Sequence, residues 1–298
     1  MPPSPPASGQ PVLRFAPSPN GRLHLGHALS ALTNERLARA MGGRLLLRIE
    51  DIDRARCTPA FERGLRDDLD WLGVPFAGEV RRQSEHFGDY RVALEGLLRR
   101  GLVYPCFCSR QEVRAAAFAR AQETGEGWPV DPDGAPLYPG RCRGLDAGLA
   151  ESRIASGAPH LLRFDLEHAL AAVGEDLAYG VFDASGGVTR VVAQPRRWGD
   201  VVLARKDVPT SYHLSVVIDD ALQGVTHVVR GRDLEAATDI HVLLQRLLGL
   251  PTPLYHFHDL LADAEGRKLA KSRGSRTVNS EISVESVIAL EASATPWR

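Results

Sequence analysis

The stretch "VLRFAPSPNGRLHLGHALSALTNERLARAMGGRLLLRIE" runs from Val12 to Glu50 and decides the fold. "VLRFA" has the apolar pattern of a buried strand, and "RLLLRIE" repeats it. Between them, apolar residues recur at helical spacing until Gly42-Gly43, which can cap a helix C-terminus. Strand, helix and strand within about forty residues form a βαβ unit. We therefore predict an α/β fold with a Rossmann-type, doubly wound parallel sheet, whose ligands bind beyond the carboxyl ends of the strands.

The sequence predicts that the whole chain has four parts. Residues 1–11 are rich in Pro and Ser and read as a disordered leader. Segments 12–104 and 199–250 form the Rossmann domain, with "GDVVLAR" and "GVTHVVRG" as strands that return to the sheet. Residues 105–198 differ in composition, with cysteines and a Gly/Pro-rich loop, and are predicted to form an inserted subdomain. Residues 251–298 form a helical or irregular segment that carries "KLAKS".

Composition limits the class of protein. The chain has 298 residues, 44% hydrophobic and 24% charged, with a formal net charge of -1. It is therefore an ordinary globular protein rather than a polycation, and any nucleic-acid contact depends on local basic patches such as "QPRRWGDVVLARKD". No apolar run is long enough to span a bilayer. Four cysteines without a secretory signal predict a cytoplasmic protein with reduced thiols.

His24 and His27 lie at the mouth of the first helix, with Gly26 between them. An H-x-x-H pair can ligate zinc, but no third ligand or general base lies nearby. Packing is the ordinary role of such a histidine. Phosphate binding fits better, because a helix N-terminus offers free N–H groups and imidazoles add donors. Gly26 would let a flat group such as adenine lie against the backbone.

Lys268 and Lys271 lie near the other end, in "RKLAKS", with glycines on both sides. Exposed lysines are usually only solvated. A lysine-bearing loop is also suited to neutralising a leaving pyrophosphate.

Three cysteines of the insertion suggest zinc. Cys106 and Cys108 form a C-x-C pair, and Cys142 follows across the loop. Cysteine does not supply a fourth ligand, because Cys57 lies far away in sequence. Three unligated cysteines in a small insertion remain the alternative.

"HLGH" with "KLAKS" resembles the paired HIGH and KMSKS motifs of class I aminoacyl-tRNA synthetases. The wider text, including "LLRIEDIDRAR", "SYHLSVVIDD" and "GVTHVVRGRDL", is similar in order and spacing to the glutamyl-tRNA synthetase catalytic core from about Val12 to Arg276. Two departures are that His27 follows the HIGH form, where the truncated branch of the family often has Ser, and that Ala270 replaces a common Ser. Neither removes a charge that the chemistry needs.

The resemblance is to the truncated branch, because longer members continue into an anticodon-binding region. It implies ATP-dependent activation of glutamate, with Mg²⁺, as glutamyl-adenylate. The glutamate is then transferred to the queuosine base in the anticodon loop of tRNA(Asp), and we expect a monomer without a membrane partner. It also implies that Tyr138 is a ligand, completing one structural zinc site with Cys106, Cys108 and Cys142. Basic residues near the insertion, Arg141, Arg143, Arg196 and Arg197, are expected to hold loop phosphates.

The implied site residues fall into two groups. The expected glutamate-binding residues are Arg14, Phe15, Ala16, Pro17, Ser18, Glu50, Tyr212 and Arg230. Among them, Glu50 takes the ammonium, Tyr212 bonds the side-chain carboxylate, and either arginine suits a carboxylate. The expected ATP-binding residues are His24, Gly26, His27 and Lys271, with Lys268 helping to stabilise pyrophosphate.

Three alternatives stay open at this point. The first is a synthetase that charges the 3′ end of tRNA(Glu) with help from another subunit, which transfer assays with queuosine-containing and queuosine-free tRNA would distinguish. The second is a small-molecule nucleotidyltransferase, since those also use H-x-G-H, although the glutamate-site text and the cysteines argue against this. The third is a catalytically silent RNA-binding paralogue, which an ATP–pyrophosphate exchange assay would decide.

Overall fold

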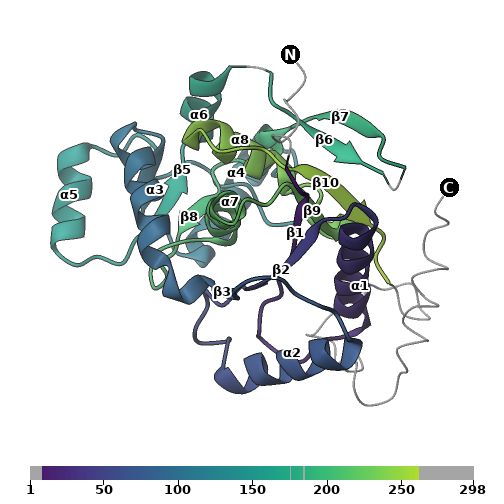
Figure 1. Cartoon of the computed structure of the whole chain (residues 1–298). Helices are drawn as coiled ribbons and strands as arrows, with labels where there is room; N and C mark the ends of the chain where they lie inside the picture. Colours follow the sequence, from purple (N-terminus) through teal and green to yellow (C-terminus); the bar gives the residue numbers. More distant parts are fainter. Residues whose placement is uncertain (1–8, 175, 184, 262–298) are drawn as a thin grey trace.

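A computed structural model describes residues 9–174, 176–183 and 185–261 of the chain (Figure 1). Most of the predicted leader and the whole "KLAKS" loop, with Lys268 and Lys271, lie outside these described residues. No helix in the described ranges is both long and apolar enough to cross a membrane.

The described elements alternate between helices and short strands. The strands are β1 (Val12–Phe15), β2 (Arg44–Ile49), β3 (Arg81–Arg82), β4 (Val103–Cys106), β5 (Leu161–Phe164), β6 (Ala178–Phe182), β7 (Val188–Val192), β8 (Val202–Ala204), β9 (His227–Gly231) and β10 (Leu254–His258). The α-helices are α1 (Leu25–Ala40), α2 (Pro59–Leu72), α3 (Phe87–Arg99), α4 (Arg110–Thr124), α5 (Ala147–Ala155), α6 (Leu166–Val173), α7 (Tyr212–Leu222) and α8 (Thr238–Leu248). Single 3₁₀ turns are η1 (Gln83–Glu85), η2 (Pro195–Trp198) and η3 (Arg232–Leu234).

Parallel pairing dominates the part of the fold that contains the first βαβ unit. β1, β2 and β3 pair in that order, all parallel. A second sheet has the order β7-β6-β10-β9, with β10 parallel to both β6 and β9. The two sheets meet where the Thr226 amide donates to the Val12 carbonyl at 2.9 Å. The predicted α/β fold with a parallel sheet is confirmed.

A separate antiparallel sheet, β4-β5-β8, lies with α5 on the side of the molecule away from α1 (Figure 1). The expectation that "GDVVLAR" returns to the parallel sheet is wrong, because β8 pairs with β5 instead. The reverse holds for β6 and β7, which lie within the predicted insertion but join the sheet of β9 and β10. These strands have three to five residues, too few for periodicity to indicate which sheet they enter.

β10 corrects a further expectation. Residues 254–258, predicted to be helical or irregular, form a strand between β6 and β9. The run "LYHFH" is aromatic and histidine-rich, and pairing with two neighbouring strands decides its conformation rather than its local pattern. The division of the chain at residues 105, 198 and 250 stays a prediction.

Local sequence explains where several helices begin and end. Thr58 caps α2 by accepting a hydrogen bond from the Phe61 amide at 3.3 Å, and Pro59 occupies the first turn. Gly73 ends this helix in the left-handed conformation, with φ of 67°. Ser109 and Glu112 form a reciprocal capping box at the start of α4.

Two hydrophobic clusters hold the fold together. One lies between α1, α2 and the first sheet, and β2 is buried at every position after Arg44. Such a continuous buried run is typical of a parallel strand that is covered on both faces. The larger cluster joins α3, α7 and α8 to β9, β10 and the antiparallel sheet. Phe15, at the end of β1, belongs to the first cluster, and Tyr212, at the start of α7, packs against the larger one; both residues line the cavity described next.

Candidate active site

A cavity of about 370 Å³ opens at the carboxyl ends of β1, β2 and β9, beside the first turns of α1 and α7. This is the edge at which the sequence predicted a ligand. The predicted residues that line it are Arg14, Phe15, Ala16, Pro17, Ser18, His24, Gly26, His27, Glu50, Tyr212 and Arg230. The structure thus gathers all eight predicted glutamate-binding residues and three of the predicted ATP-binding residues around one cavity.

His24 and His27 close the N-terminus of α1. The Gly26 amide donates to His24 Nδ1 at 3.0 Å, and the His24 amide donates to His27 Nδ1 at 3.3 Å. An imidazole nitrogen that accepts a hydrogen bond carries no proton, so each neutral ring carries its proton on Nε2. The rings lie with their centres 3.8 Å apart. The two histidines therefore cap the helix and also present Nε2–H donors at a helix N-terminus that lines the cavity.

Gly26 leaves close space for the ring of the first of these histidines. A Cβ atom at position 26 would lie 3.0 Å from Cε1 of the His24 ring. A larger residue would therefore require this imidazole to shift slightly. The suggested contact between Gly26 and an adenine stays a prediction.

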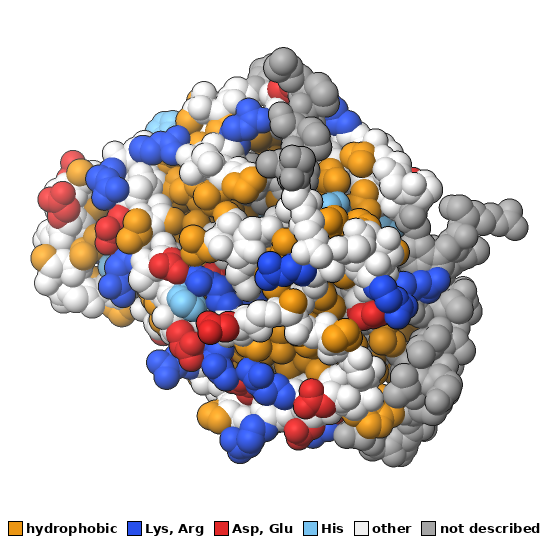
Figure 2. All heavy atoms as spheres, viewed as in Figure 1, with side chains coloured by type: hydrophobic (Ala, Val, Ile, Leu, Met, Phe, Trp, Pro, Cys, Tyr) orange, Lys and Arg blue, Asp and Glu red, His pale blue; other side chains and the backbone are white. Residues whose placement is uncertain are grey.

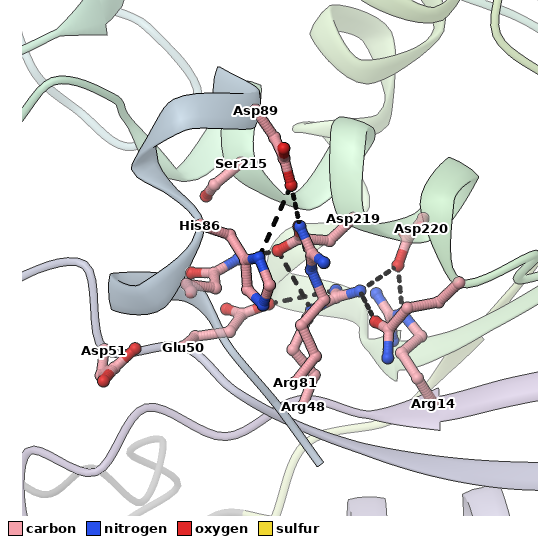
Figure 3. Close-up of polar contacts among 12 residues, drawn as sticks. Arg14, Arg48, Glu50, Asp51, Arg81, His86, Asp89, Ser215, Asp219 and Asp220 are labelled. Atoms are coloured by element: carbon pink, nitrogen blue, oxygen red, sulfur yellow. Dashed lines mark hydrogen bonds and ion pairs between the residues drawn. The ribbon is translucent and has the colours of Figure 1, made fainter. Parts of the chain in front are cut away.

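A buried charge network fixes two of the predicted binding residues (Figure 3). Asp220, on α7, accepts from Arg14 Nε at 3.1 Å and from Arg48 Nη1 at 2.7 Å. Arg48 Nη2 donates in turn to Glu50 at 3.2 Å. Arg48 has no exposed surface. One carboxylate of α7 thus aligns Arg14 directly and Glu50 through Arg48.

The carboxyl group of Glu50 lies on the wall of the cavity. Burial raises the pKa of its carboxyl above the ordinary value of 4.5, although Arg48 and Arg14 act in the opposite direction. Its hydrogen bond from Arg48 occupies one oxygen, Oε1. A carboxylate that is held in this way on the wall of a cavity is suited to a ligand ammonium group.

Arg230, at the end of β9, has a different environment. Its Nη1 donates to the Tyr212 hydroxyl at 3.4 Å, and its Nη2 donates to Thr238 Oγ1 at 2.6 Å. Its Nη1 also lies 3.2 Å from His241 Nδ1. These partners are uncharged, so the positive charge of Arg230 is suited to an anionic ligand.

The three cysteines of the insertion converge. The Sγ atoms of Cys106, Cys108 and Cys142 lie within 4.8 Å of one another and are buried. The Tyr138 hydroxyl accepts from Cys106 Sγ at 3.3 Å and lies 3.5 Å from Cys108 Sγ. Tetrahedral zinc with Zn–S bonds of about 2.3 Å needs sulfur atoms roughly 3.8 Å apart. The group can therefore hold a metal ion.

The four arginines that were expected to hold phosphates differ in their surroundings. Arg143 donates to Asp200 at 2.6 Å, Arg196 to Glu167 at 2.5 Å, and Arg197 to Asp239 at 2.6 Å. Of these four arginines, only Arg141 forms no ion pair with a described residue. Figure 2 likewise shows basic and acidic side chains side by side on the face in view. A phosphate would therefore compete with a carboxylate at three of these positions.

Some residues of the candidate site escaped the sequence analysis. Arg48, Asp220 and His241 contact the predicted site residues, and Asp233 and His258 line the cavity. Two signals existed. Arg48 and Glu50 have the i, i+2 spacing that shares one face of a strand, and Asp219-Asp220 interrupts the apolar run "SVVI". His241 carried no signal in a helix pattern that fits ordinary packing.

Comparison with known proteins gives matches along most of the chain. The family of class I tRNA synthetases (E and Q), catalytic domain, matches residues 11–287. A glutamyl-Q tRNA(Asp) synthetase of Rhodobacter capsulatus is 51% identical over 90% of this chain and 93% of its own length. One of Symbiobacterium thermophilum is 41% identical over 89% of this chain and 79% of its own length.

Longer relatives match the same region. A glutamate–tRNA ligase of Aquifex aeolicus is 36% identical over 89% of this chain, which spans 52% of that protein. The crystal structure of a glutamate tRNA ligase from Elizabethkingia meningosepticum, in complex with its amino acid, superposes with a TM-score of 0.70 at 28% identity. That match covers 89% of this chain and 53% of the ligase.

Proposed function

Because the chain belongs to the class I tRNA synthetase catalytic-domain family for glutamate and glutamine, we propose that it activates glutamate with ATP and transfers it to the queuosine base of tRNA(Asp). The observation that carries the proposal is the set of charges around the cavity. Arg14, Glu50, Tyr212 and Arg230 come from four separate segments and line one space. Two cations, one anion and a hydroxyl match the two carboxylates and the ammonium of glutamate.

Activation is an in-line attack of the glutamate α-carboxylate on the α-phosphorus of ATP, which releases pyrophosphate. No covalent bond to the enzyme forms, so the protein contributes positioning and stabilisation of charge. Glu50 holds the ammonium and thereby aims the carboxylate. Nε2–H groups of His24 and His27 donate to phosphate oxygens. Lys268 and Lys271, outside the described residues, would stabilise the departing pyrophosphate, and Mg²⁺ accompanies ATP as part of the substrate.

Zinc would be held by Cys106, Cys108, Cys142 and Tyr138. The convergence of three buried Sγ atoms and one phenol oxygen supports this assignment. The ion would be structural, because it would tie the loop that carries Tyr138 and Cys142 to the end of β4, in a subdomain with a small core of its own. It takes no part in the chemical steps.

Acceptor identification tests the proposal. Purified protein with glutamate, ATP, Mg²⁺ and labelled pyrophosphate should incorporate the label into ATP without tRNA, and labelled glutamate replaces the labelled pyrophosphate in the transfer arm. It should then label tRNA(Asp) that contains queuosine, and removal of the 3′ CCA end should leave this transfer intact. The matched control is the same tRNA(Asp) with guanine in place of queuosine, which should stay unlabelled.

Two outcomes would contradict the proposed acceptor. Loss of label after CCA removal would make the protein an acceptor-end synthetase, and so would labelling of tRNA(Glu). Absence of glutamate-dependent exchange in the first arm would exclude the activation step itself. The nucleotidyltransferase alternative predicts exchange that does not depend on glutamate.

A further inference from the structure

Arg230 differs from the other buried arginines of the described chain. Arg14 and Arg48 are at most 5% exposed, and each forms an ion pair with Asp220. Arg230 is also 5% exposed, but no carboxylate of a described residue lies within 4.0 Å of it. A buried cation without a counter-charge is costly unless hydrogen bonds replace its hydration. Other contacts must therefore replace the water around the Arg230 guanidinium.

Neutral acceptors on two helix starts replace that hydration. Tyr212 and Thr238 are the first residues of α7 and α8, and both offer hydroxyl oxygens to Arg230. His241, one turn further along α8, offers Nδ1 at 3.2 Å. Each partner can accept a hydrogen bond without neutralising the charge, whereas Asp220 balances Arg14.

The hydrogen-bond chain runs in one direction only. A guanidinium donates and never accepts, so His241 Nδ1 must be the acceptor and must carry no proton. The proton of His241 then lies on Nε2, which is 3.3 Å from His213 Nδ1. His213 Nδ1 must therefore accept as well. Arg230 thus dictates one neutral tautomer of His241, and His213 is the acceptor that satisfies it.

Both imidazoles stay neutral in this surrounding. Burial lowers the pKa of His213 to about 4, and Arg230 contributes to the shift. Burial and the nearby Arg230 also hold the pKa of His241 well below 6.5. A charged His241 would lose its acceptor atom and would add a second positive charge beside Arg230.

We propose that His241 is a positioning residue that orients Arg230 while leaving its positive charge uncompensated for a carboxylate of glutamate, and that His213 fixes the tautomer that this requires. The inference rests on the proposed glutamate-binding role of Arg230. It adds the reason why an imidazole, rather than a carboxylate, contacts the guanidinium at this point.

A charge-only pair of variants tests the proposal. His241→Asn places an amide oxygen near the position of Nδ1 and stays neutral, whereas His241→Asp has the same shape and adds a negative charge. In glutamate-dependent ATP–pyrophosphate exchange, we expect H241D to raise the KM for glutamate at least about 10-fold relative to H241N. The KM for ATP should stay the same in both variants. Equal glutamate KM values in two folded variants would overturn the proposal.

The half-buried His213 provides a second pair in case H241D does not fold. His213→Leu removes the acceptor for His241 Nε2–H, and His213→Asn keeps one. We expect H213L to raise the glutamate KM about threefold or more over H213N, with thermal unfolding of each measured alongside. Equal KM values here would also overturn the inference. Wild-type protein without any glutamate-dependent exchange would instead refute the proposed function.

Discussion

At the scale of single residues, Glu50 combines a place in a buried charge network with the proposed binding of the glutamate ammonium group. It accepts from Arg48 in the buried network and lines the cavity. Glu50→Gln keeps the shape but cannot hold an ammonium by charge. We expect this variant to raise the KM for glutamate roughly 10- to 100-fold in pyrophosphate exchange, the loss of one charge-assisted contact. Glu85→Gln, at an exposed glutamate of η1, is the matched control and should leave that KM unchanged.

The pH dependence of glutamate binding follows from the same carboxyl. Burial raises the pKa of Glu50 above 4.5, and only the ionised form can hold the ammonium. Glutamate binding should therefore weaken as pH falls, starting at a higher pH than an ordinary carboxyl would give. The KM for glutamate should rise in this acidic limb of the pH profile in the wild type, and the rise should be absent in E50Q. Persistence of the same limb in E50Q would assign it to another group.

At the scale of elements, we propose that zinc ligands, together with a small core, hold the loop between α4 and α5 in place. Tyr138 and Cys142 in this loop meet Cys106 and Cys108 at the end of β4. Cys108→Ser should lower the zinc content from about one ion per chain and increase proteolysis within the insertion, because bound metal contributes directly to local folding. Cys57→Ser is the control, since Cys57 lies apart from this group beside Ser18.

Metal analysis of protein purified without chelator decides this point. Zinc-free wild-type protein with an intact insertion would contradict the site, and so would full zinc content in C108S. Unfolding of the parallel sheet in C108S would contradict the local role of the ion, because the cysteine cluster is separate from both large clusters of the core.

At the scale of the whole molecule, Asp220 joins the two halves of the chain. It pairs with Arg14 of β1 and Arg48 of β2, residues that precede it by 206 and 172 positions. Asp220→Asn leaves two buried cations without this counter-charge, and we expect a loss of about 3 kcal/mol in the free energy of unfolding. Asp89→Asn removes a half-exposed partner of Arg81 and should cost less than about 1 kcal/mol. Chemical unfolding of the two variants measures the difference.

Acid should remove this stabilisation in the wild type. Burial acts to raise the pKa of Asp220, but Arg14 and Arg48 outweigh it and hold that pKa below 3.8. A carboxyl with a lowered pKa in the folded state contributes stability above its unfolded pKa and loses it as pH falls through the folded value. The difference in the free energy of unfolding between wild type and D220N should thus have its full value at about pH 7 and should shrink below about pH 4. A gap that widened in acid would contradict the ion-pair explanation.

The sequence by itself determined the features that depend on near neighbours. The βαβ unit, the helix that begins at Leu25 directly after His24, and the C-x-C spacing all follow from residues a few positions apart. Periodicity, capping and turn chemistry act over that range. The resemblance to glutamyl-tRNA synthetases then predicted Arg14, Glu50, Tyr212 and Arg230 as glutamate-binding residues, although it did not indicate what holds them in place.

Only the tertiary structure decided how those residues are held and which strands share a sheet. β8 lies outside the parallel sheet in which it was predicted, whereas β6 and β10 belong to the sheet of β9. Strands of three to five residues take their place from hydrogen-bonded partners far along the chain. The acidic pair Asp219-Asp220 stood out in its helix pattern, but the sequence did not indicate which cations it meets, and His241 belongs to a helix whose pattern fits ordinary packing. Their contacts come from burial beside Arg14, Arg48 and Arg230, since a charge removed from water must find its partners in whichever distant segment the fold brings close.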